Sequence, residues 1–357
     1  MSGWDRVLAR EAGLLPWAEG LRREGTMTDA ERDTTRRQAI GLALAGAAAP
    51  LRSAGSQPRS PDAAGGRATT DKKPPLLGVF VGNTLEDVPA FEQWLGREVD
   101  GVLGFTGGTG WAEIGDPGWF IELWSRIDRP VFWSVPLVPA RDRRALDDAA
   151  NGIHNAVYKR AARKLAAFRP QDDRVFIRTG WEFNGDWFPW SAAGRERAFV
   201  NAFRQFVDSF RSVSNRFRFE WNVNMGASKT DPERCYPGDA HVDVVGMDFY
   251  WHLQYTSPDP LEAWDKMLSG DHGLRWHQDF AAGRGKPTAY SEWGVTTDNA
   301  EPILERVKAW FDDHDVLYQT YWDSNAGFPG KLSRGSFAGT GSAYVRLFSQ
   351  REPRRGA

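Results

Sequence analysis

Short apolar runs alternate along the chain with longer segments that are apolar on one face only. From Leu76 onward, eight runs have the length and residue types of buried β-strands. The predicted strands span Leu76–Val81, Val99–Phe105, Pro130–Pro136, Arg174–Trp181, Arg216–Asn222, Val242–Tyr250, Pro287–Glu292 and Leu317–Trp322. Most of these runs are continuously apolar, which is typical of parallel strands covered on both faces.

Helical periodicity fills the intervals between the predicted strands. The clearest case is Arg195–Val213, where Phe199, Phe203, Phe206 and Phe210 form one aromatic stripe. Such a stripe indicates a helix face that packs against a sheet. Further helices are predicted over Ala156–Phe168, Leu261–Phe280, Ile303–Asp312 and Ser342–Phe348.

Eight strand–helix units in about 280 residues predict an α/β fold of the (β/α)8 TIM-barrel type. A doubly wound open sheet is the alternative. The glycine cluster Gly107–Gly110 lacks the spacing of a phosphate-binding loop, however, and we interpret it as a tight turn near the cleft.

The segment that precedes the barrel has the composition of a targeting signal. The twin arginine Arg36-Arg37 is followed by a weakly apolar, Ala/Gly-rich stretch over 41–50, which indicates a Tat-type export signal. That stretch is too short to span a membrane. A short amphipathic helix after Thr34 is the alternative interpretation.

These patterns divide the chain into five parts. Residues 1–26 are interpreted as a leader or a mis-assigned start, because Met27 would give the signal normal proportions. Residues 27–55 are the predicted signal and 56–75 a flexible Ser/Gly/Pro/Ala-rich linker. Residues 76–350 form the expected barrel and 351–357 a tail.

Composition and charge exclude several classes of function. A formal net charge of −2 gives no reason to expect nucleic acid as a partner. The single Cys235 excludes an intrachain disulfide framework, and the six histidines show no metal-ligand spacing, so neither a metal nor another cofactor is expected. The 17 tryptophans indicate an aromatic core or stacking surfaces in a cleft.

Two glutamates end strands that would lie on opposite sides of the barrel. Glu182 follows the fourth predicted strand and Glu292 ends the seventh. Glycoside hydrolysis needs such a pair, one carboxylic acid to protonate the departing oxygen and one carboxylate to attack or stabilise the sugar. We expect Glu182, beside Trp181, to be the acid with a raised pKa, and Arg178 to keep the partner ionised. Alternatively, each glutamate merely bridges loops.

Three motifs carry a resemblance to a known family. They are RTGWEFNGDWFPW at 178–190, CYPGDAHVDVVGMDFY at 235–250 and SEWG at 291–294. They resemble motifs of glycoside hydrolase family 26, which includes β-mannanases, and the likeness covers most of 76–350. The resemblance implies a retaining mechanism with Glu182 as acid/base and Glu292 as nucleophile. It further implies that Tyr250 bonds the nucleophile, Asp248 supports that region, Trp187 lines the sugar-binding floor and Trp322 stacks on the sugar.

One position departs from the family pattern. Mannanases of the family usually have histidine before the acid/base glutamate, whereas this chain has Trp181. An indole offers bulk and a single N–H donor, so the departure weakens a mannan assignment while leaving the mechanism intact.

Further side chains near predicted strand ends are candidates for binding sugar. Aromatic rings can stack on sugar rings, and amides or imidazoles can bond hydroxyl groups. Core packing or solvent exposure is the alternative for each of them. These candidates are Trp111, Trp190, Trp293, Asn184, Asn222 and His252.

The sequence therefore predicts an exported endo-β-glycanase that acts on a polysaccharide or oligosaccharide, such as β-mannan, β-glucan or β-1,3-xylan. One alternative is an enzyme of the same mechanism that processes the producer's own exopolysaccharide. A second is a barrel that binds polysaccharide without cleaving it. We expect no membrane span and a monomer.

Overall fold

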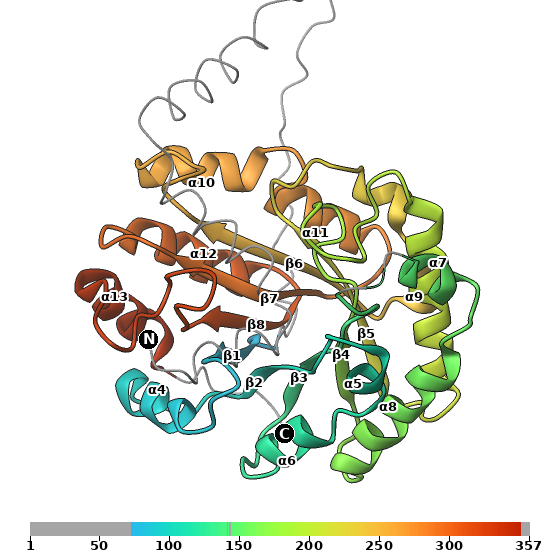
Figure 1. The fold of residues 1–357 in the computed structure, drawn as a ribbon. Coiled ribbons are helices and arrows are strands. Elements are labelled where there is room, and N and C mark those ends of the chain that lie inside the picture. The colour runs from blue at the N-terminus through green and yellow to red at the C-terminus, as the bar shows by residue number, and fades with distance from the viewer. Residues whose placement is uncertain (1–72, 141, 143, 351–357) are drawn as a thin grey trace, which may run out of the picture. The chain divides into compact units, whose positions relative to one another are not determined.

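A computed structural model describes residues 73–140, 142 and 144–350. In this part of the chain, parallel strands close into a barrel in sequence order, β1 to β8, with β1 paired to β8 (Figure 1). The strands are β1 Leu76–Phe80, β2 Gly101–Phe105, β3 Val131–Ser134, β4 Val175–Arg178, β5 Phe217–Asn224, β6 Val244–Trp251, β7 Thr288–Val295 and β8 Val316–Trp322. The predicted (β/α)8 fold and its strand order are thereby confirmed.

Helices surround the barrel in Figure 1 and cover its outer face. They are α4 Asp87–Leu95, α5 Trp111–Gly115, α6 Gly118–Trp124, α7 Ala145–Ala150, α8 Asn155–Phe168, α9 Glu196–Arg211, α10 Pro260–Ser269, α11 Leu274–Ala282, α12 Glu301–Asp313 and α13 Ala338–Phe348, with short 3-10 helices at Pro232–Cys235 and Asp239–His241. The phenylalanine stripe of α9 is fully buried, so its predicted packing is confirmed.

The helix predicted over Leu261–Phe280 is wrong as one element. The structure has two helices there, because α10 ends at Ser269 and α11 begins only at Leu274. Between them His272 has a left-handed backbone (φ 52°) that no α-helix accommodates. Apolar positions occur on both sides of the break, but Gly270 and Gly273 within it were a loop signal that the prediction did not use.

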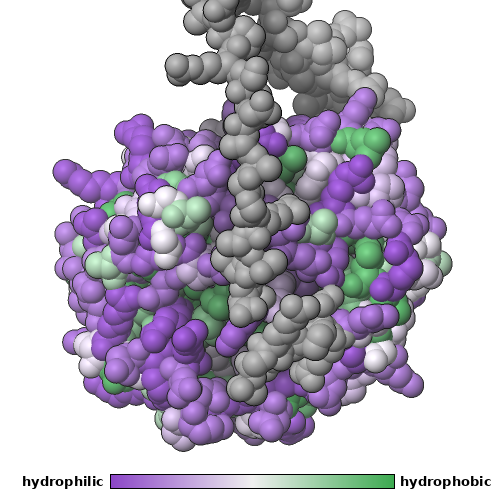
Figure 2. Space-filling view, turned by 180° about the vertical axis from the view of Figure 1, so that it is seen from behind, coloured by the Kyte–Doolittle hydropathy of each residue, from purple (hydrophilic) through white to green (hydrophobic). Residues whose placement is uncertain are grey.

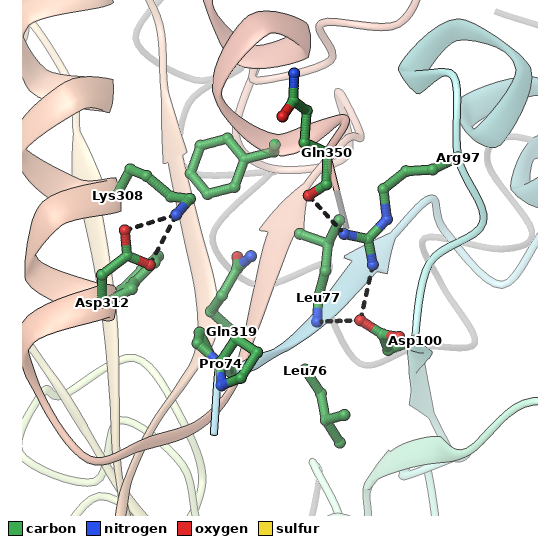
Figure 3. A pocket seen from close by; sticks show the side chains of 12 residues that line it. Pro74, Leu76, Leu77, Arg97, Asp100, Lys308, Asp312, Gln319 and Gln350 are labelled. Carbon is green, nitrogen blue, oxygen red and sulfur yellow. Dashed lines mark hydrogen bonds and ion pairs between the residues drawn. The ribbon is translucent and has the colours of Figure 1, made fainter. Parts of the chain in front are cut away.

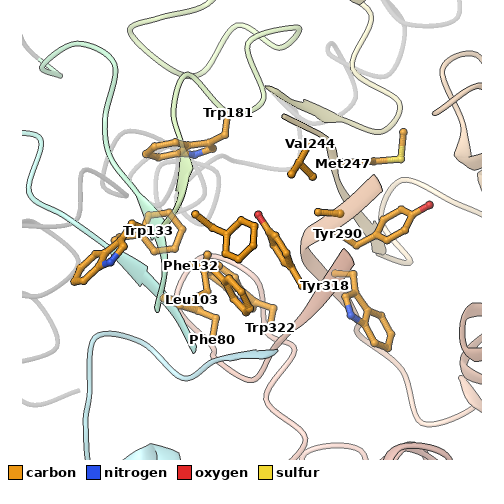
Figure 4. Close-up of a cluster of buried hydrophobic side chains, with 14 of the residues drawn as sticks. Phe80, Leu103, Phe132, Trp133, Trp181, Val244, Met247, Tyr290, Tyr318 and Trp322 are labelled. Carbon is orange, nitrogen blue, oxygen red and sulfur yellow. The ribbon is translucent and has the colours of Figure 1, made fainter. Parts of the chain in front are cut away.

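The barrel interior is packed largely with aromatic side chains. Tyr318 stacks on Phe132 from the far side of the barrel at 4.2 Å between ring centroids, and Trp322 stacks on Phe80 at 3.9 Å. Figure 4 shows these four rings together between the strands. The interior is therefore a solid core, and a substrate can approach only from the ends of the strands.

A small cavity of about 60 Å³ lies at the start of β1, away from the carboxyl ends of the strands. Ion pairs line it, with Lys308 bound to Asp312 and Arg97 to Asp100 (Figure 3). Lys308 and Asp312 both lie on α12, and Arg97 and Asp100 both lie in the loop between α4 and β2, so each pair stabilises one local segment at this end of the barrel.

The outer face shown in Figure 2 is mostly hydrophilic, with scattered apolar residues. Within residues 73–350, no helix combines the length and apolar character needed to cross a bilayer. The predicted signal at 27–55, the parts 1–26 and 351–357, and nearly all of the linker at 56–75 lie outside the described residues.

Candidate active site

Strand β4 brings Arg178 to the centre of the barrel mouth, where its guanidinium group holds two carboxylates. Nη1 donates to Asp248 Oδ2 at 2.7 Å, and Nη2 donates to Glu292 Oε1 at 2.5 Å. Arg178 Nε donates to Ser134 Oγ at 2.9 Å, which orients the guanidinium group. Burial lowers the pKa of Arg178, but the charges of Asp248, Glu292 and Glu220 outweigh that effect and raise it. Arg178 is therefore a permanent cation.

Glu292 is held from two sides on β7. Its Oε1 accepts from Arg178, and its Oε2 accepts from the Tyr250 hydroxyl at 2.7 Å. Burial, followed by the charge of Glu292, raises the pKa of Tyr250 well above its ordinary value, so the phenol remains a donor. Two donors on one carboxylate fix its orientation, and the Arg178 donor is a cation.

Glu182 lies just beyond β4 in a strained conformation. Its φ is 53°, in the left-handed region, which costs a residue with a side chain about 1–2 kcal/mol. Its backbone N–H donates to the Asn222 carbonyl at 3.0 Å, and the Gly185 N–H donates to the Glu182 carbonyl at 3.0 Å. These bonds hold the turn, and such strain is typical of functional sites.

Two neutral donors bind the Glu182 carboxyl group. Trp187 Nε1 donates to Oε2 and Asn224 Nδ2 donates to Oε1, each at 2.7 Å. Burial, followed by the charge of Glu292, raises the pKa of Glu182 to about 7, against the two hydrogen bonds and Arg178. Glu182 and Glu292 therefore interact electrostatically, and a large fraction of Glu182 carries a proton at neutral pH.

Aromatic rings form the walls around this group. Trp181 and Phe105 lie over the Arg178 guanidinium at 5.2 and 5.3 Å. Trp322 is buried on the floor, edge-on to Tyr250 at 6.3 Å. Trp187 is 37% exposed and lies so close to Gly185 that a Cβ there would be 2.4 Å from the ring. The site thus has an apolar lining that shields its charges.

His252 lies in the loop after β6. Its ring contacts Phe328 at 5.6 Å, and Phe328 in turn packs on Tyr250 at 4.2 Å. Burial lowers the pKa of His252, so its imidazole is neutral at neutral pH. This places His252 on the side of the site that carries Tyr250, where its role in binding sugar stays a prediction.

Several predicted sugar contacts are wrong because the side chains are buried and used elsewhere. Trp293 follows the inward-pointing Glu292, so it points out of the barrel, donates to Gln319 Oε1 and packs on α12 and α13. Trp190 is buried under Trp181 and donates to its carbonyl at 2.7 Å.

Both predicted asparagines also lie in the interior. Asn184 is fully buried, accepts from the Asn224 N–H and donates to the Asn224 and Ala227 carbonyls. It therefore joins two loops instead of facing sugar. Asn222 is fully buried beneath the site, where its amide donates to Glu220 and Asp248. Trp111, the remaining candidate, stacks on His154 at 3.5 Å between α5 and α8.

The Asn184 correction has a measurable consequence. Asn184→Ala should lower the free energy of unfolding by about 2 kcal/mol, because buried backbone groups lose their partner. KM should stay within twofold of wild type, because the side chain does not reach the cleft. Chemical denaturation and steady-state kinetics measure both quantities, and a large rise in KM at unchanged stability would restore the binding role.

Sequence reasoning missed two polar residues of this site, Asn224 and Glu220. Both lie on β5 and share the inward face with Asn222, at the two-residue spacing of a strand. That alternation of polar residues in an otherwise apolar strand was the available signal.

The indole N–H of Trp187 tunes the acidity of Glu182. Trp187→Phe removes one hydrogen bond to the ionised carboxylate, so the pKa of Glu182 should rise. The alkaline limb of kcat/KM should then move to higher pH by roughly one unit. A pH profile measures this, with Trp119→Phe, an exposed tryptophan on α6, as control. An unchanged or lowered limb would contradict the interpretation.

A barrel with opposed carboxyl groups at the carboxyl ends of β4 and β7 has its site where barrel enzymes carry their active sites. Residues 132–268 match the model of glycosyl hydrolase family 26. This match over 132–268 confirms the resemblance predicted from the motifs.

Two known proteins are similar in sequence to part of this chain. Endoglucanase H of Acetivibrio thermocellus is 29% identical over 131 residues, which are 34% of this chain and 14% of that protein. A mannan endo-1,4-beta-mannosidase of Bifidobacterium adolescentis is 31% identical over 129 residues, or 35% of this chain and 12% of that protein. The chain thus spans only a small part of the length of these relatives.

Solved structures extend the likeness of fold over most of the chain. The catalytic domain of the Bacillus sp. JAMB-750 endo-beta-1,4-mannanase has a TM-score of 0.59 at 18% identity, covering 78% of this chain and 86% of that one. The Bacteroides ovatus beta-mannanase BoMan26A has a TM-score of 0.54 at 17% identity, covering 79% and 90%. At these identities the likeness is one of fold.

Proposed function

We propose that this chain is a retaining endo-β-glycanase that cleaves β-mannan, β-glucan or β-1,3-xylan by double displacement. The observation that carries the proposal is the contrast between the two glutamates. Glu182 has a pKa of about 7 and can donate a proton, while Glu292 is paired with the Arg178 cation and accepts from the Tyr250 hydroxyl. Paired carboxyl groups in opposite protonation states are the requirement for glycoside hydrolysis.

In the first step, Glu182 protonates the departing glycosidic oxygen while a Glu292 carboxylate oxygen attacks the anomeric carbon. The bond from that carbon to the leaving group breaks, and a glycosyl ester on Glu292 forms. In the second step, Glu182, now ionised, removes a proton from water as the water attacks the same carbon. The ester breaks, Glu292 is released as a carboxylate, and the anomeric configuration is retained.

The names of the sequence relatives support the choice of substrates. The relatives named above are an endoglucanase and mannan endo-1,4-beta-mannosidases, so β-glucan and β-mannan come first. Trp181, at the position before the acid, is buried against Trp190 and Phe105, so it shapes the wall and leaves the choice among these polymers to experiment.

Purified protein should be incubated with β-mannans, β-glucans, β-1,3-xylan and bacterial exopolysaccharides, with reducing ends measured. Activity on a plant-type polymer, absent from Glu182→Ala and Glu292→Ala, would support the proposal. Activity restricted to an exopolysaccharide would shift the substrate class. Binding without any release of reducing ends would show a non-catalytic barrel and overturn the proposal.

We also propose that the chain is exported, from the Arg36-Arg37 motif and the apolar stretch that follows it. Expression in a host with and without a functional twin-arginine pathway tests this. Replacing both arginines by lysine should leave the protein in the cytoplasm, whereas unchanged export would contradict the proposal.

A further inference from the structure

Strand β5 carries a row of polar side chains into the barrel. Asn224, Asn222 and Glu220 lie at every second position, so they point inward at three successive depths. Asn224 binds Glu182 at the mouth, and Asn222 binds Asp248 at 2.9 Å one layer below. Glu220 occupies the next layer, where the side chains of such barrels are normally apolar.

Space for the Glu220 carboxylate is provided by the neighbouring strand β6. A Cβ at Gly246 of β6 would lie 1.9 Å from Glu220 Oε1. Glu220 is also buried to 1% exposure, beside the stacked Phe132–Tyr318 pair. A buried carboxylate costs folding free energy unless it is fully paired, so its presence here needs an explanation beyond packing.

Donors surround the Glu220 carboxylate. Ser291 Oγ lies 2.7 and 2.8 Å from its two oxygens, Tyr318 OH donates to Oε2, and Asn222 Nδ2 donates to Oε1 at 3.0 Å. Ser291 directly precedes Glu292 in the chain. Three donor groups therefore bind this carboxylate below the reacting pair, and its charge contributes to the raised pKa of Arg178.

The Asn222 amide links this charge to the site. Its nitrogen donates to Glu220 and to Asp248, while its carbonyl oxygen has no hydrogen-bond partner in the described part of the chain. Both partners are acceptors, so the two carboxylates fix which way the amide points. Asp248 binds Arg178, and Arg178 binds Glu292, which completes a continuous chain of polar contacts.

We propose that Glu220 is a positioning residue whose buried carboxylate acts on the reacting pair through Asn222, Asp248 and Arg178. The proposal rests on the proposed function. Glu220 accepts a hydrogen bond from Asn222, and Asn222 donates another to Asp248. Asp248 in turn orients the Arg178 guanidinium group so that it binds Glu292. The negative charge of Glu220 also acts on Arg178 beneath the site, and a negative charge there favours the positive charge of the oxocarbenium-like transition state.

Glu220→Gln tests this, because it removes the charge and keeps the shape. kcat should fall roughly tenfold with KM unchanged, because the contact acts in the transition state. Asn222→Ala should lower kcat similarly, and the double variant should be no worse than the worse single variant, because both act on one chain of contacts. Thr320→Val, a fully buried inward position on β8 outside this chain, should keep wild-type kcat.

A second measurement requires no substrate. The groups that face Glu182 are Glu292, Asp248, Arg178, Asn224 and Trp187. Removing one negative charge beneath them should lower the pH at which the Glu182 carboxyl titrates. Carbon-13 NMR of labelled glutamate follows this midpoint, with the Glu182 resonance assigned by its loss in Glu182→Gln.

The outcomes separate this inference from the proposed function. Wild-type kcat in folded Glu220→Gln, or additive losses in the double variant, would overturn the inference while leaving the glycanase intact. If wild type cleaves no glycan, the proposed function fails. The inference about Glu220 is then tested by the pH midpoint of the Glu182 titration, and an unchanged midpoint in Glu220→Gln would overturn it. If Glu220→Gln does not fold, Asn222→Ala tests the same chain of contacts. A wild-type kcat in Asn222→Ala would overturn the inference.

Discussion

Replacing Glu292 by alanine is expected to lower kcat by roughly 10⁴- to 10⁶-fold, because the attacking atom itself is removed. Substrate binding should be less affected, since the aromatic walls and Trp322 remain. The measurement is steady-state hydrolysis of the polymer identified in the screen. Glu305→Gln, at an exposed position on α12, is the matched control and should retain full activity.

Azide distinguishes a lost nucleophile from a damaged fold. In Glu292→Ala, this small anion can enter the space of the missing carboxylate and attack the anomeric carbon of an activated β-aryl glycoside. The aryl alcohol leaves and an α-glycosyl azide forms. Failure of azide to restore turnover in a folded variant, or a wild-type product released initially as the inverted anomer, would assign Glu292 another role.

Much of the fold could be predicted from the chain because strands that are covered on both faces read as continuous apolar runs. All eight runs became strands, and the α9 stripe packs as its spacing predicted. The break between α10 and α11 was missed because apolar positions suited to a helix occur on both sides of it, although Gly270 and Gly273 between them were an available loop signal. Helix α4 and the short helices α5 to α7 also lacked a long periodic signal.

The site was partly predictable for a similar reason. Glu182, Glu292 and Arg178 follow or end apolar strands, so topology alone brings them to one mouth. Side-chain direction decided the failures. Trp293 is adjacent to Glu292 but points to the opposite face, and Asn184 lies in a turn whose backbone needs its amide. Neither direction can be assigned without the register of the strand and the path of the loop.

Replacing Glu182 by alanine should produce losses that depend on the leaving group. On polysaccharide, whose alkoxide leaves poorly, kcat should fall roughly 10²- to 10⁴-fold without proton donation. On a dinitrophenyl glycoside, whose phenolate needs no proton, formation of the glycosyl ester should be nearly normal. Hydrolysis of that ester should then be slow, because Glu182 also serves as the base, so a burst of phenolate and a low apparent KM are expected.

Azide again identifies the role, with the opposite product. In Glu182→Ala the nucleophile Glu292 is intact, so azide attacks the glycosyl ester, breaks its bond to Glu292 and gives a β-glycosyl azide. In wild type, kcat/KM should fall as pH rises through about 7, where Glu182 loses its proton, and this limb should be absent from the variant. Equal losses on both leaving groups would show that Glu182 is not the acid, since only proton donation depends on the basicity of the departing oxygen.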